Sequence, residues 1–311
     1  MEHSPWDPED VEFLLAADGE PVGEIRIEAL EARALYKQLV AARCLDHKLA
    51  QRRLPMWVSS AGEEATSTCV GALVSAEEWV YPGPRDVGVA IGRGLPFDEI
   101  ARQALGGAQA DHRGRLRAGT IVSHSAGIAP PSAALGMHLP LAAGHAHAAK
   151  LSRLGHATIA MFGEGLTTTG VFHETISLAA CCELPLVFVC KSQLWPDQAP
   201  AEAGLLGDSV ADRARSCGVW TRRVDGADPL IVHQTLRHAL LRAREGSGPA
   251  LVETVISPMR QDPPPHRDPV ERLRRYLDTR GQWTKTFQDV VEAEFNTAFD
   301  KTANALEAAA V

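Results

Sequence analysis

The chain has 311 residues, of which 45% are hydrophobic, and a formal net charge of −8, so it can bury a large core as one α/β domain or two. The negative charge argues against a nucleic acid or an anionic membrane as partner. No apolar run approaches the roughly 18 residues of a membrane-spanning helix, and the acidic N-terminus lacks a signal peptide's basic and apolar parts. Six cysteines without CxxC spacing are typical of free thiols in a cytoplasmic protein.

The first 25 residues are predicted to form an irregular N-terminal arm, and residues 26–311 a single domain. Prolines oppose regular structure in the arm, and they stand at Pro5, Pro8 and Pro21. Leucines at helical spacing between Ile27 and Arg52 predict the first helix. Residues 107–132, rich in glycine, serine, histidine and arginine, predict a long loop, and a small-residue helix is expected from His138 to Leu151.

The chemistry is expected in the stretch from His156 to Trp195. An apolar run at residues 156–162 predicts a buried strand, which stops at Gly163-Glu164-Gly165 because two glycines allow a sharp turn. A helix is predicted from about Thr167, and a second strand from Leu184 to Cys190 leads into Lys191-Ser192-Gln193. Strand, helix and strand make a βαβ unit, and ligands bind beyond the carboxyl ends of its strands.

Two nucleotide-binding motifs are excluded at this turn. A dinucleotide fingerprint needs a third glycine at position 168, which is a threonine, and no Gly-Lys-Ser/Thr of a P-loop opens the helix. Glu164 and Gln193 instead provide hard oxygen ligands suited to Mg²⁺, and the helix N-terminus would offer N–H groups to a phosphate. A Gly-Glu-Gly turn is more often only a turn, so the residues alone leave a metal site and a plain turn both open.

The rest of the chain predicts further alternating elements. They are a helix from Val210 to Cys217, a strand from Trp220 to Val224, a helix from Pro229 to Glu245 and a last core strand from Pro249 to Val255. The sequence Asp225-Gly226-x-Asp228 is expected to cap the third of these.

These segments resemble the alpha subunit of the thiamine diphosphate-dependent 2-oxoacid dehydrogenases, the decarboxylating component of the pyruvate and branched-chain complexes. The resemblance spans almost the whole chain from about residue 25. The residues that carry it are Phe162–Gly165, Gly170, Phe172–Glu174, Leu184–Val189 and the segments SSAGEEATSTCVGAL and EEWVYPGPRDVGVAIGRG. It implies an α/β thiamine diphosphate-binding fold, in which a central, mostly parallel sheet carries helices on both faces.

The resemblance also implies a function. The chain would be an alpha-subunit-like component of a 2-oxoacid dehydrogenase, which catalyses oxidative decarboxylation of a 2-oxo acid with acyl transfer to lipoamide, of the branched-chain (2-oxoisovalerate) rather than the pyruvate type. It implies thiamine diphosphate and Mg²⁺ as cofactors. The expected partners are a beta subunit in an α2β2 heterotetramer and a lipoyl-bearing acyltransferase, and the expected location is cytoplasmic.

On the same resemblance, site residues can be carried over one by one. The implied cofactor contacts are Arg85, Gly163, Glu164, Gly165, Ser192 and Gln193. The implied Mg²⁺ ligands are the side chains of Glu164 and Gln193 and the backbone carbonyl of Trp195. Two loop histidines, His124 and His266, are the candidates for the catalytic histidines of the family.

The chain departs from the family pattern at the residues that would surround thiamine diphosphate. The departures are Glu164, Ser192-Gln193, Pro84, Val87 and a closing loop about a dozen residues short with a stiff Pro263–Pro265 run. They leave a second hypothesis open, a catalytically degraded relative that acts as a binding or regulatory subunit. A third is altered chemistry on a related thiamine cofactor or with another metal.

Overall fold

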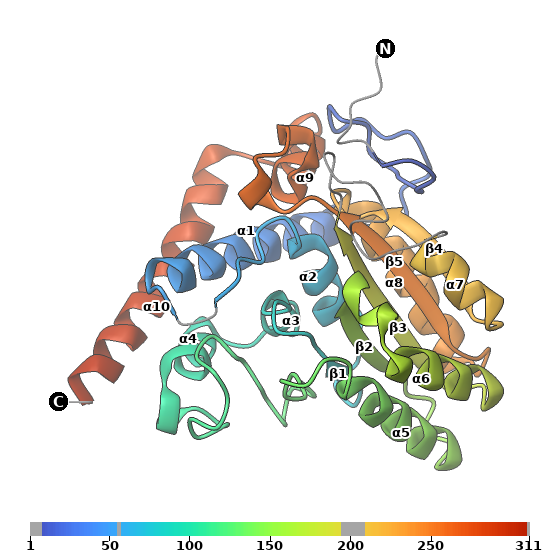
Figure 1. Cartoon of the computed structure of the whole chain (residues 1–311). Coiled ribbons are helices and arrows are strands. Elements are labelled where there is room, and N and C mark those ends of the chain that lie inside the picture. Colours follow the sequence, from blue (N-terminus) through green and yellow to red (C-terminus); the bar gives the residue numbers. More distant parts are fainter. Residues whose placement is uncertain (1–7, 55–56, 194–208, 310–311) are drawn as a thin grey trace.

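The computed structural model describes residues 8–54, 57–193 and 209–309, which build a five-stranded sheet between two layers of helices (Figure 1). The strands are β1 (Trp79–Tyr81), β2 (Thr158–Gly163), β3 (Leu186–Gln193), β4 (Trp220–Asp225) and β5 (Ala250–Ile256). Their order is β1-β2-β3-β5-β4, and every neighbouring pair is parallel. The predicted α/β fold with a central parallel sheet is confirmed.

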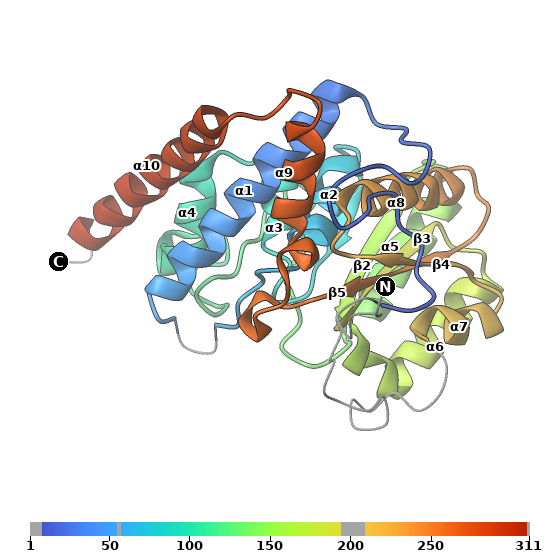
Figure 2. The ribbon, with the colours of Figure 1, turned by 90° about the horizontal axis from the view of Figure 1, so that it is seen from above.

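The helices fall into two groups. Those on one face of the sheet are α5 (His138–Leu151), α6 (Gly170–Cys181) and α7 (Val210–Ser216). On the other face lie α2 (Glu64–Leu73) and α8 (Pro229–Arg244), flanked by α1 (Ala29–Gln51), α3 (Gly88–Gly92), α4 (Phe97–Leu105), α9 (Pro269–Asp278) and α10 (Lys285–Ala309). Figure 2 shows α1, α4 and α10 side by side, away from the sheet.

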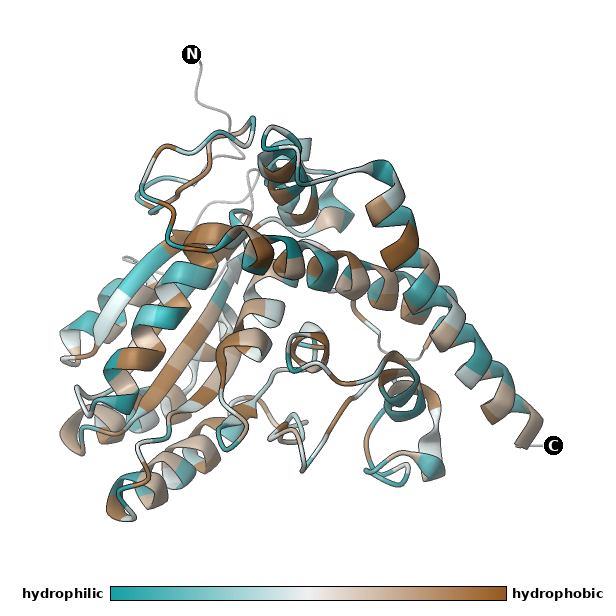
Figure 3. Cartoon of the chain, turned by 180° about the vertical axis from the view of Figure 1, so that it is seen from behind, coloured by the Kyte–Doolittle hydropathy of each residue, from teal (hydrophilic) through white to brown (hydrophobic). Residues whose placement is uncertain are grey.

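The central strands are apolar on both faces, which explains their near-continuous hydrophobic runs. Met161 and Val189 face the core formed with α2 and α8, whereas Phe162 and Phe188 face the core formed with α5, α6 and α7. Figure 3 shows the strands as a hydrophobic band, with the polar faces of the helices turned outward. Complete burial of one such side chain is worth about 1.5–3 kcal/mol, so the strand ends are held by a well-packed sheet.

The turn after β2 differs from the prediction. The helix expected from about Thr167 begins only at Gly170, because residues Glu164–Thr168 form the 3-10 helix η2. The hydroxyls of Thr167, Thr168 and Thr169 donate to carbonyl oxygens three residues back, at 2.7–2.9 Å. Such bonds favour the tighter 3-10 geometry.

The N-terminal arm is bound to the edge of the sheet. Within residues 8–25 no helix forms, but Glu12 lies opposite Val224 on β4. The Glu12 N–H donates to the Arg223 carbonyl, and the Glu12 carbonyl accepts from the Asp225 N–H, both at 3.0 Å. Leu14 and Leu15 are buried, and their N–H groups donate to the Asp228 carboxylate at 2.6 and 2.7 Å. The division of the chain into an arm and a single domain stays a prediction.

Two further features agree with the composition. None of the helices in the described ranges is long and apolar enough to cross a membrane. All six cysteines are free thiols.

Candidate functional site

The carboxyl ends of β1, β2, β3 and β5 meet at one edge of the sheet, where parallel α/β sheets bind ligands. β2 ends at Gly163, which lies opposite Lys191, and β3 continues from there to Gln193. Glu164 and Gln193, the two predicted metal ligands, therefore lie at neighbouring strand ends. The turn of residues 82–87 after β1 borders the same edge, and the chain after β5 supplies Arg260 in the 3-10 helix η3 (Met259–Gln261).

A buried ion cluster lies under this edge. The Lys191 ammonium is 2.5 Å from Glu63 Oε2 and 2.5 Å from Asp86 Oδ1, and all three side chains are almost completely buried. Arg85 Nη1 lies 2.9 Å from the second oxygen of Glu63, and the second oxygen of Asp86 accepts a 2.7 Å bond from the Gly83 N–H. The cluster thus joins the start of α2, the turn after β1 and the end of β3.

The charges in this cluster stabilise one another. Burial by itself lowers the pKa of Lys191, but the Asp86 and Glu63 carboxylates outweigh it, so the pKa of Lys191 is raised. Lys191 therefore stays an ammonium at neutral pH. Held by Glu63, the Arg85 guanidinium lies over the end of β2, where a methyl group added to Gly163 would be 3.9 Å from Arg85 Nη2.

The negative charge of the Glu164 carboxylate is only partly stabilised by its neighbours. Burial raises its pKa, whereas the backbone N–H groups of Glu164 and Gln193 and the nearby Arg85 lower it only in part. A carboxylate with a raised pKa at a strand end is suited to receive a cation, because a cation would restore the charged form.

The residues at the end of β3 alternate between the two faces of the sheet. The Ser192 hydroxyl donates to Glu253 Oε1 at 2.7 Å, and Glu253 also accepts from the Ala211 N–H at 2.8 Å, so this serine faces the α7 side. Gln193 lies on the other face, where its Oε1 accepts a 2.9 Å bond from Arg260 Nη2. The structure therefore brings together Arg85, Gly163, Glu164 and Gln193, with the Ser192 side chain turned away from them.

Of the two candidate histidines, His124 lies away from the site. His124 is exposed and packs edge-on against Trp79, with ring centroids 5.2 Å apart. Trp79 is opposite Thr158, six residues before Glu164 and so roughly 20 Å back along the strand. His266 is half-buried in the 3-10 helix η4 (Pro265–Arg267), after β5. Gly165 is exposed at the turn, and Trp195 lies outside the described residues.

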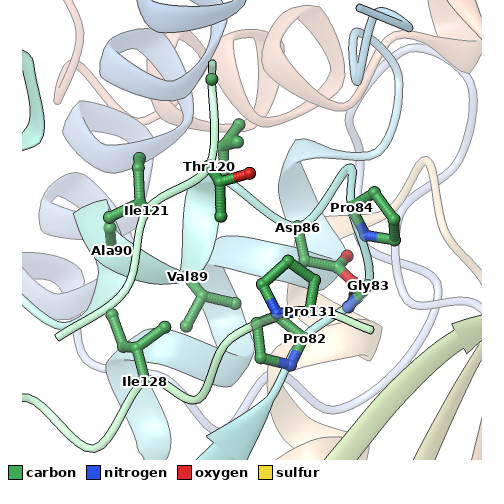
Figure 4. A pocket seen from close by; sticks show the side chains of 12 residues that line it. Pro82, Gly83, Pro84, Asp86, Val89, Ala90, Thr120, Ile121, Ile128 and Pro131 are labelled. Carbon is green, nitrogen blue, oxygen red and sulfur yellow. Dashed lines mark hydrogen bonds between the residues drawn. The ribbon is translucent and has the colours of Figure 1, made fainter. Parts of the chain in front are cut away.

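A small cavity of about 20 Å³ lies beside the turn after β1. Figure 4 shows Asp86 folded back next to Gly83, while Thr120 and Ile121 approach from the loop. Pro84, one of the departures from the family pattern, lines the cavity. The loop of residues 119–131 thus closes this side of the site.

Sequence reasoning missed the partners of Lys191. A lysine at the end of a buried strand requires nearby carboxylates, because an unpaired buried charge costs several kcal/mol. That requirement was a usable signal, but it does not say which acids provide the partners. Glu63 and Asp86 are 128 and 105 positions away along the chain, so only the folded structure identifies them.

The site brings together two kinds of binding group at one edge of a parallel sheet. Arg85 and Arg260 provide guanidinium donors for phosphate oxygens, and Glu164 and Gln193 provide oxygen ligands for a hard cation. This donor set fits a diphosphate bound together with a divalent metal ion. The fold and site therefore define an α/β protein with a site suited to an anionic cofactor beyond its strand ends.

The comparisons with known proteins agree with this class. The family model described as dehydrogenase E1 component matches residues 33–310, so the chain belongs to this family. The 3-methyl-2-oxobutanoate dehydrogenase subunit alpha of Mycobacterium tuberculosis is 29% identical over 90% of this chain and 80% of its own. The 2-oxoisovalerate dehydrogenase subunit alpha of Bacillus subtilis is 28% identical over 90% of this chain and 92% of its own. The pyruvate dehydrogenase E1 component subunit alpha of Bacillus cereus is 27% identical over 90% of this chain and 80% of its own.

The resemblance derived from the sequence is thereby confirmed. The relatives named here are alpha subunits of 2-oxo acid dehydrogenases, and none of the three supports the alternative of a degraded binding subunit.

Proposed function

We propose that this chain is the catalytic alpha subunit of a thiamine diphosphate-dependent dehydrogenase for a branched-chain 2-oxo acid, such as 3-methyl-2-oxobutanoate. The observation that supports it most strongly is the placement of Arg85, Glu164 and Gln193 around the end of β2 in a chain of the E1 family. Two of the relatives named above are branched-chain enzymes, and they cover most of both chains.

Each residue of the site has a defined part in this proposal. Arg85 binds the diphosphate, and Glu63 with Lys191 holds the Arg85 guanidinium in place. Glu164 and Gln193 hold Mg²⁺, for which Gln193 releases its bond to Arg260. Thiamine diphosphate, when bound, supplies the electron sink through which a 2-oxo acid loses carbon dioxide.

The remaining functional assignments come from the family. The proposed partners are a beta subunit, most simply in an α2β2 assembly, and a lipoyl-bearing acyltransferase that takes the acyl unit. The proposed location is the cytoplasm. Pyruvate is the alternative substrate, because an alpha subunit of a pyruvate dehydrogenase is nearly as similar as the branched-chain relatives.

The test compares the wild type with Glu164→Gln, each co-purified with the beta subunit. Titration calorimetry with Mg²⁺ present should show 1:1 binding of thiamine diphosphate by the wild type and binding at least tenfold weaker by the variant, a loss of about 1.4 kcal/mol. Carbon dioxide release should be faster from 3-methyl-2-oxobutanoate than from pyruvate. Tight binding that is the same in both proteins would contradict the assignment of Glu164.

The cofactor-free chain provides a control for folding. Because the pKa of Glu164 is raised above 4.5 in the folded state, its ionisation destabilises the fold, and stability falls as pH rises from about 4.5 through the folded pKa. Glu164→Gln removes this penalty. We therefore expect the cofactor-free variant to melt on the order of 1–2 °C higher than the wild type at pH 7, which separates lost binding from lost folding.

A further inference from the structure

The chain between β5 and α9 forms a compact loop at the cofactor site. Residues 257–267, which we call the η3–η4 loop, include η3, a left-handed turn at Asp262 with φ of 53°, and η4. Arg260, whose Nη2 donates to Gln193 Oε1 at 2.9 Å, lies in its first half. Compact surface loops whose two ends lie close together are frequently functional. The contacts that join the two ends of this loop therefore determine where Arg260 lies.

The Arg267 side chain joins the two ends of the η3–η4 loop. It is 1% exposed, and its Nε donates to Ser257 Oγ at 3.1 Å, although the two residues are ten positions apart. Its Nη2 donates to the Val255 carbonyl oxygen at 3.3 Å, and its Nη1 donates to Asp225 Oδ1 at 2.7 Å. The planar guanidinium makes these three contacts together, whereas a compact ammonium cannot span them. Arg267 thus ties the end of the loop to its beginning and to the ends of β4 and β5.

The first turn of the loop is fixed against the segment that leads into α2. The Met259 N–H donates to the Ala61 carbonyl oxygen at 3.0 Å. A methyl group added to Gly62 would lie 2.3 Å from the Ser257 carbonyl oxygen, so this close approach requires a glycine. The next residue, Glu63, belongs to the buried ion cluster under the site. The loop is therefore fixed at its start as well as at its end.

We infer that Arg267 is a positioning residue of the cofactor site, an inference that rests on the proposed function. By closing the η3–η4 loop, Arg267 holds Arg260 beside Gln193 and the diphosphate of the cofactor. Because Arg267 is buried, it acts through Arg260 and does not touch the cofactor itself. A displacement of about 1 Å can remove much of the effect of a positioned group.

Arg272 provides a matched control, because it binds the same carboxylate. Its Nη1 lies 2.6 Å from Asp225 Oδ2, and it is 4% exposed. Its Nη2 donates to the Leu15 carbonyl in the arm, and among the described residues its side chain makes no hydrogen bond to the η3–η4 loop. Loss of either arginine leaves Asp225 with one cation, so neither change strands a buried carboxylate. Arg267→Gln and Arg272→Gln therefore differ in which segment they release.

Limited trypsin digestion of the full chain without cofactor tests whether Arg267 holds the loop. Cleavage after the exposed Arg260, identified by mass spectrometry, requires the loop to open locally. Arg267→Gln should be cut there about tenfold faster than the wild type, and Arg272→Gln at the rate of the wild type. Equal rates in all three proteins would overturn the inference.

Calorimetric titration with thiamine diphosphate and Mg²⁺, on chains co-purified with the beta subunit, tests whether Arg267 acts through Arg260. Arg260→Gln and Arg267→Gln should each weaken binding about tenfold, and Arg272→Gln should leave it unchanged. The double variant should bind no more weakly than Arg260→Gln alone, because the two residues act as one unit. Additive losses, about a hundredfold in the double variant, would overturn the positioning role.

Arg267→Lys separates the shape of the guanidinium from its charge. The lysine keeps a cation beside Asp225 but cannot also bind Ser257 and the Val255 carbonyl. Its affinity for the cofactor should stay as low as that of Arg267→Gln, while its melting temperature should recover toward the wild type. Cofactor affinity equal to that of the wild type would show that charge alone suffices and would overturn the loop-closing role.

The two measurements separate this inference from the proposed function. If the wild type does not bind thiamine diphosphate, the proposed function fails, whereas digestion after Arg260 still decides whether Arg267 holds the loop. If the wild type binds it and Arg267→Gln binds it equally tightly, the positioning role fails and the proposed function stands.

Discussion

Lys191 shows how a single buried charge can organise a site. It connects Glu63 and Asp86, which come from two other segments, and through Glu63 it also fixes Arg85. Replacing a whole buried ion pair by apolar groups is often tolerated, but removing one partner is not, because the other charge is then buried alone. Lys191 is therefore required for folding and for the position of Arg85 together.

Lys191→Met should lower the free energy of unfolding by about 3–5 kcal/mol at pH 7, since two carboxylates lose their shared cation. Urea denaturation measures this change. In the wild type, the raised pKa of Lys191 means that its contribution is complete below pH 10.5 and is lost only as pH rises through the folded pKa.

Lys37→Met is the matched control. Lys37 pairs with Glu294 at 2.9 Å on the surface, so its loss should cost less than about 1 kcal/mol at any pH. Equal losses in the two variants would show that burial of Lys191 has no special consequence.

At the level of single residues, the sequence predicted correctly which residues lie at the ends of neighbouring strands. Glu164 follows the last residue of β2 and Gln193 is the last residue of the neighbouring β3, as the βαβ unit predicts. The sequence did not predict toward which face of the sheet each side chain points. Ser192 faces Glu253 because it alternates with Lys191 and Gln193, and His124 packs on Trp79 because its loop returns along β1.

At the level of elements, the predicted helices and strands agree with the structure to within a few residues, because apolar periodicity and capping residues determine them. Asp228 caps α8, as its Oδ1 accepts from the N–H groups of Leu230 and Ile231 at 3.0 and 3.3 Å. The second oxygen of Asp228 binds the arm. This second contact was not predictable, because it joins segments more than 200 residues apart.

Asp228→Ala should therefore have two effects. Loss of the cap and of the acceptor for Leu14 and Leu15 should cost about 3 kcal/mol, measured by urea denaturation. The arm should also detach from β4, so that limited proteolysis cuts within residues 8–25 in the variant but not in the wild type.

Ser209→Ala separates capping from attachment. Ser209 caps α7 by accepting from the Asp212 N–H at 3.1 Å, and it makes no contact with the arm among the described residues. Its loss should cost about 1 kcal/mol and leave the arm resistant to protease. Cleavage of the arm in this control would contradict the specific role of Asp228.

At the scale of the whole molecule, α5 presents an apolar face with no partner within the described chain. Leu141 and Leu151 on this helix are 64% and 74% exposed. Contiguous exposed apolar residues mark interaction sites, so we expect α5 to contact the beta subunit.

Leu141→Glu should weaken the assembly with the beta subunit, because a charge would be buried at the contact. Light scattering of the co-purified complex should show a shift from heterotetramer to smaller species at micromolar concentration. The free energy of unfolding of the separate chain should change by less than about 0.5 kcal/mol, since the side chain is exposed.

Leu241→Glu on α8 is the control, because Leu241 is also exposed, at 47%, but lies on another helix. It should leave the assembly intact. Dissociation caused equally by both changes would argue against a specific contact through α5.

The attachment of the arm has a consequence for synthesis on the ribosome. The Leu15 carbonyl accepts a bond from Arg272, which is made 257 positions later. At roughly 5–20 residues per second, that interval lasts about 10–50 s. Until Arg272 has been made, the site of Leu14 and Leu15 is incomplete, and the edge of β4 stays uncovered once β4 has formed. During this interval the nascent chain presents an apolar segment and an open strand edge, both typical targets of chaperones.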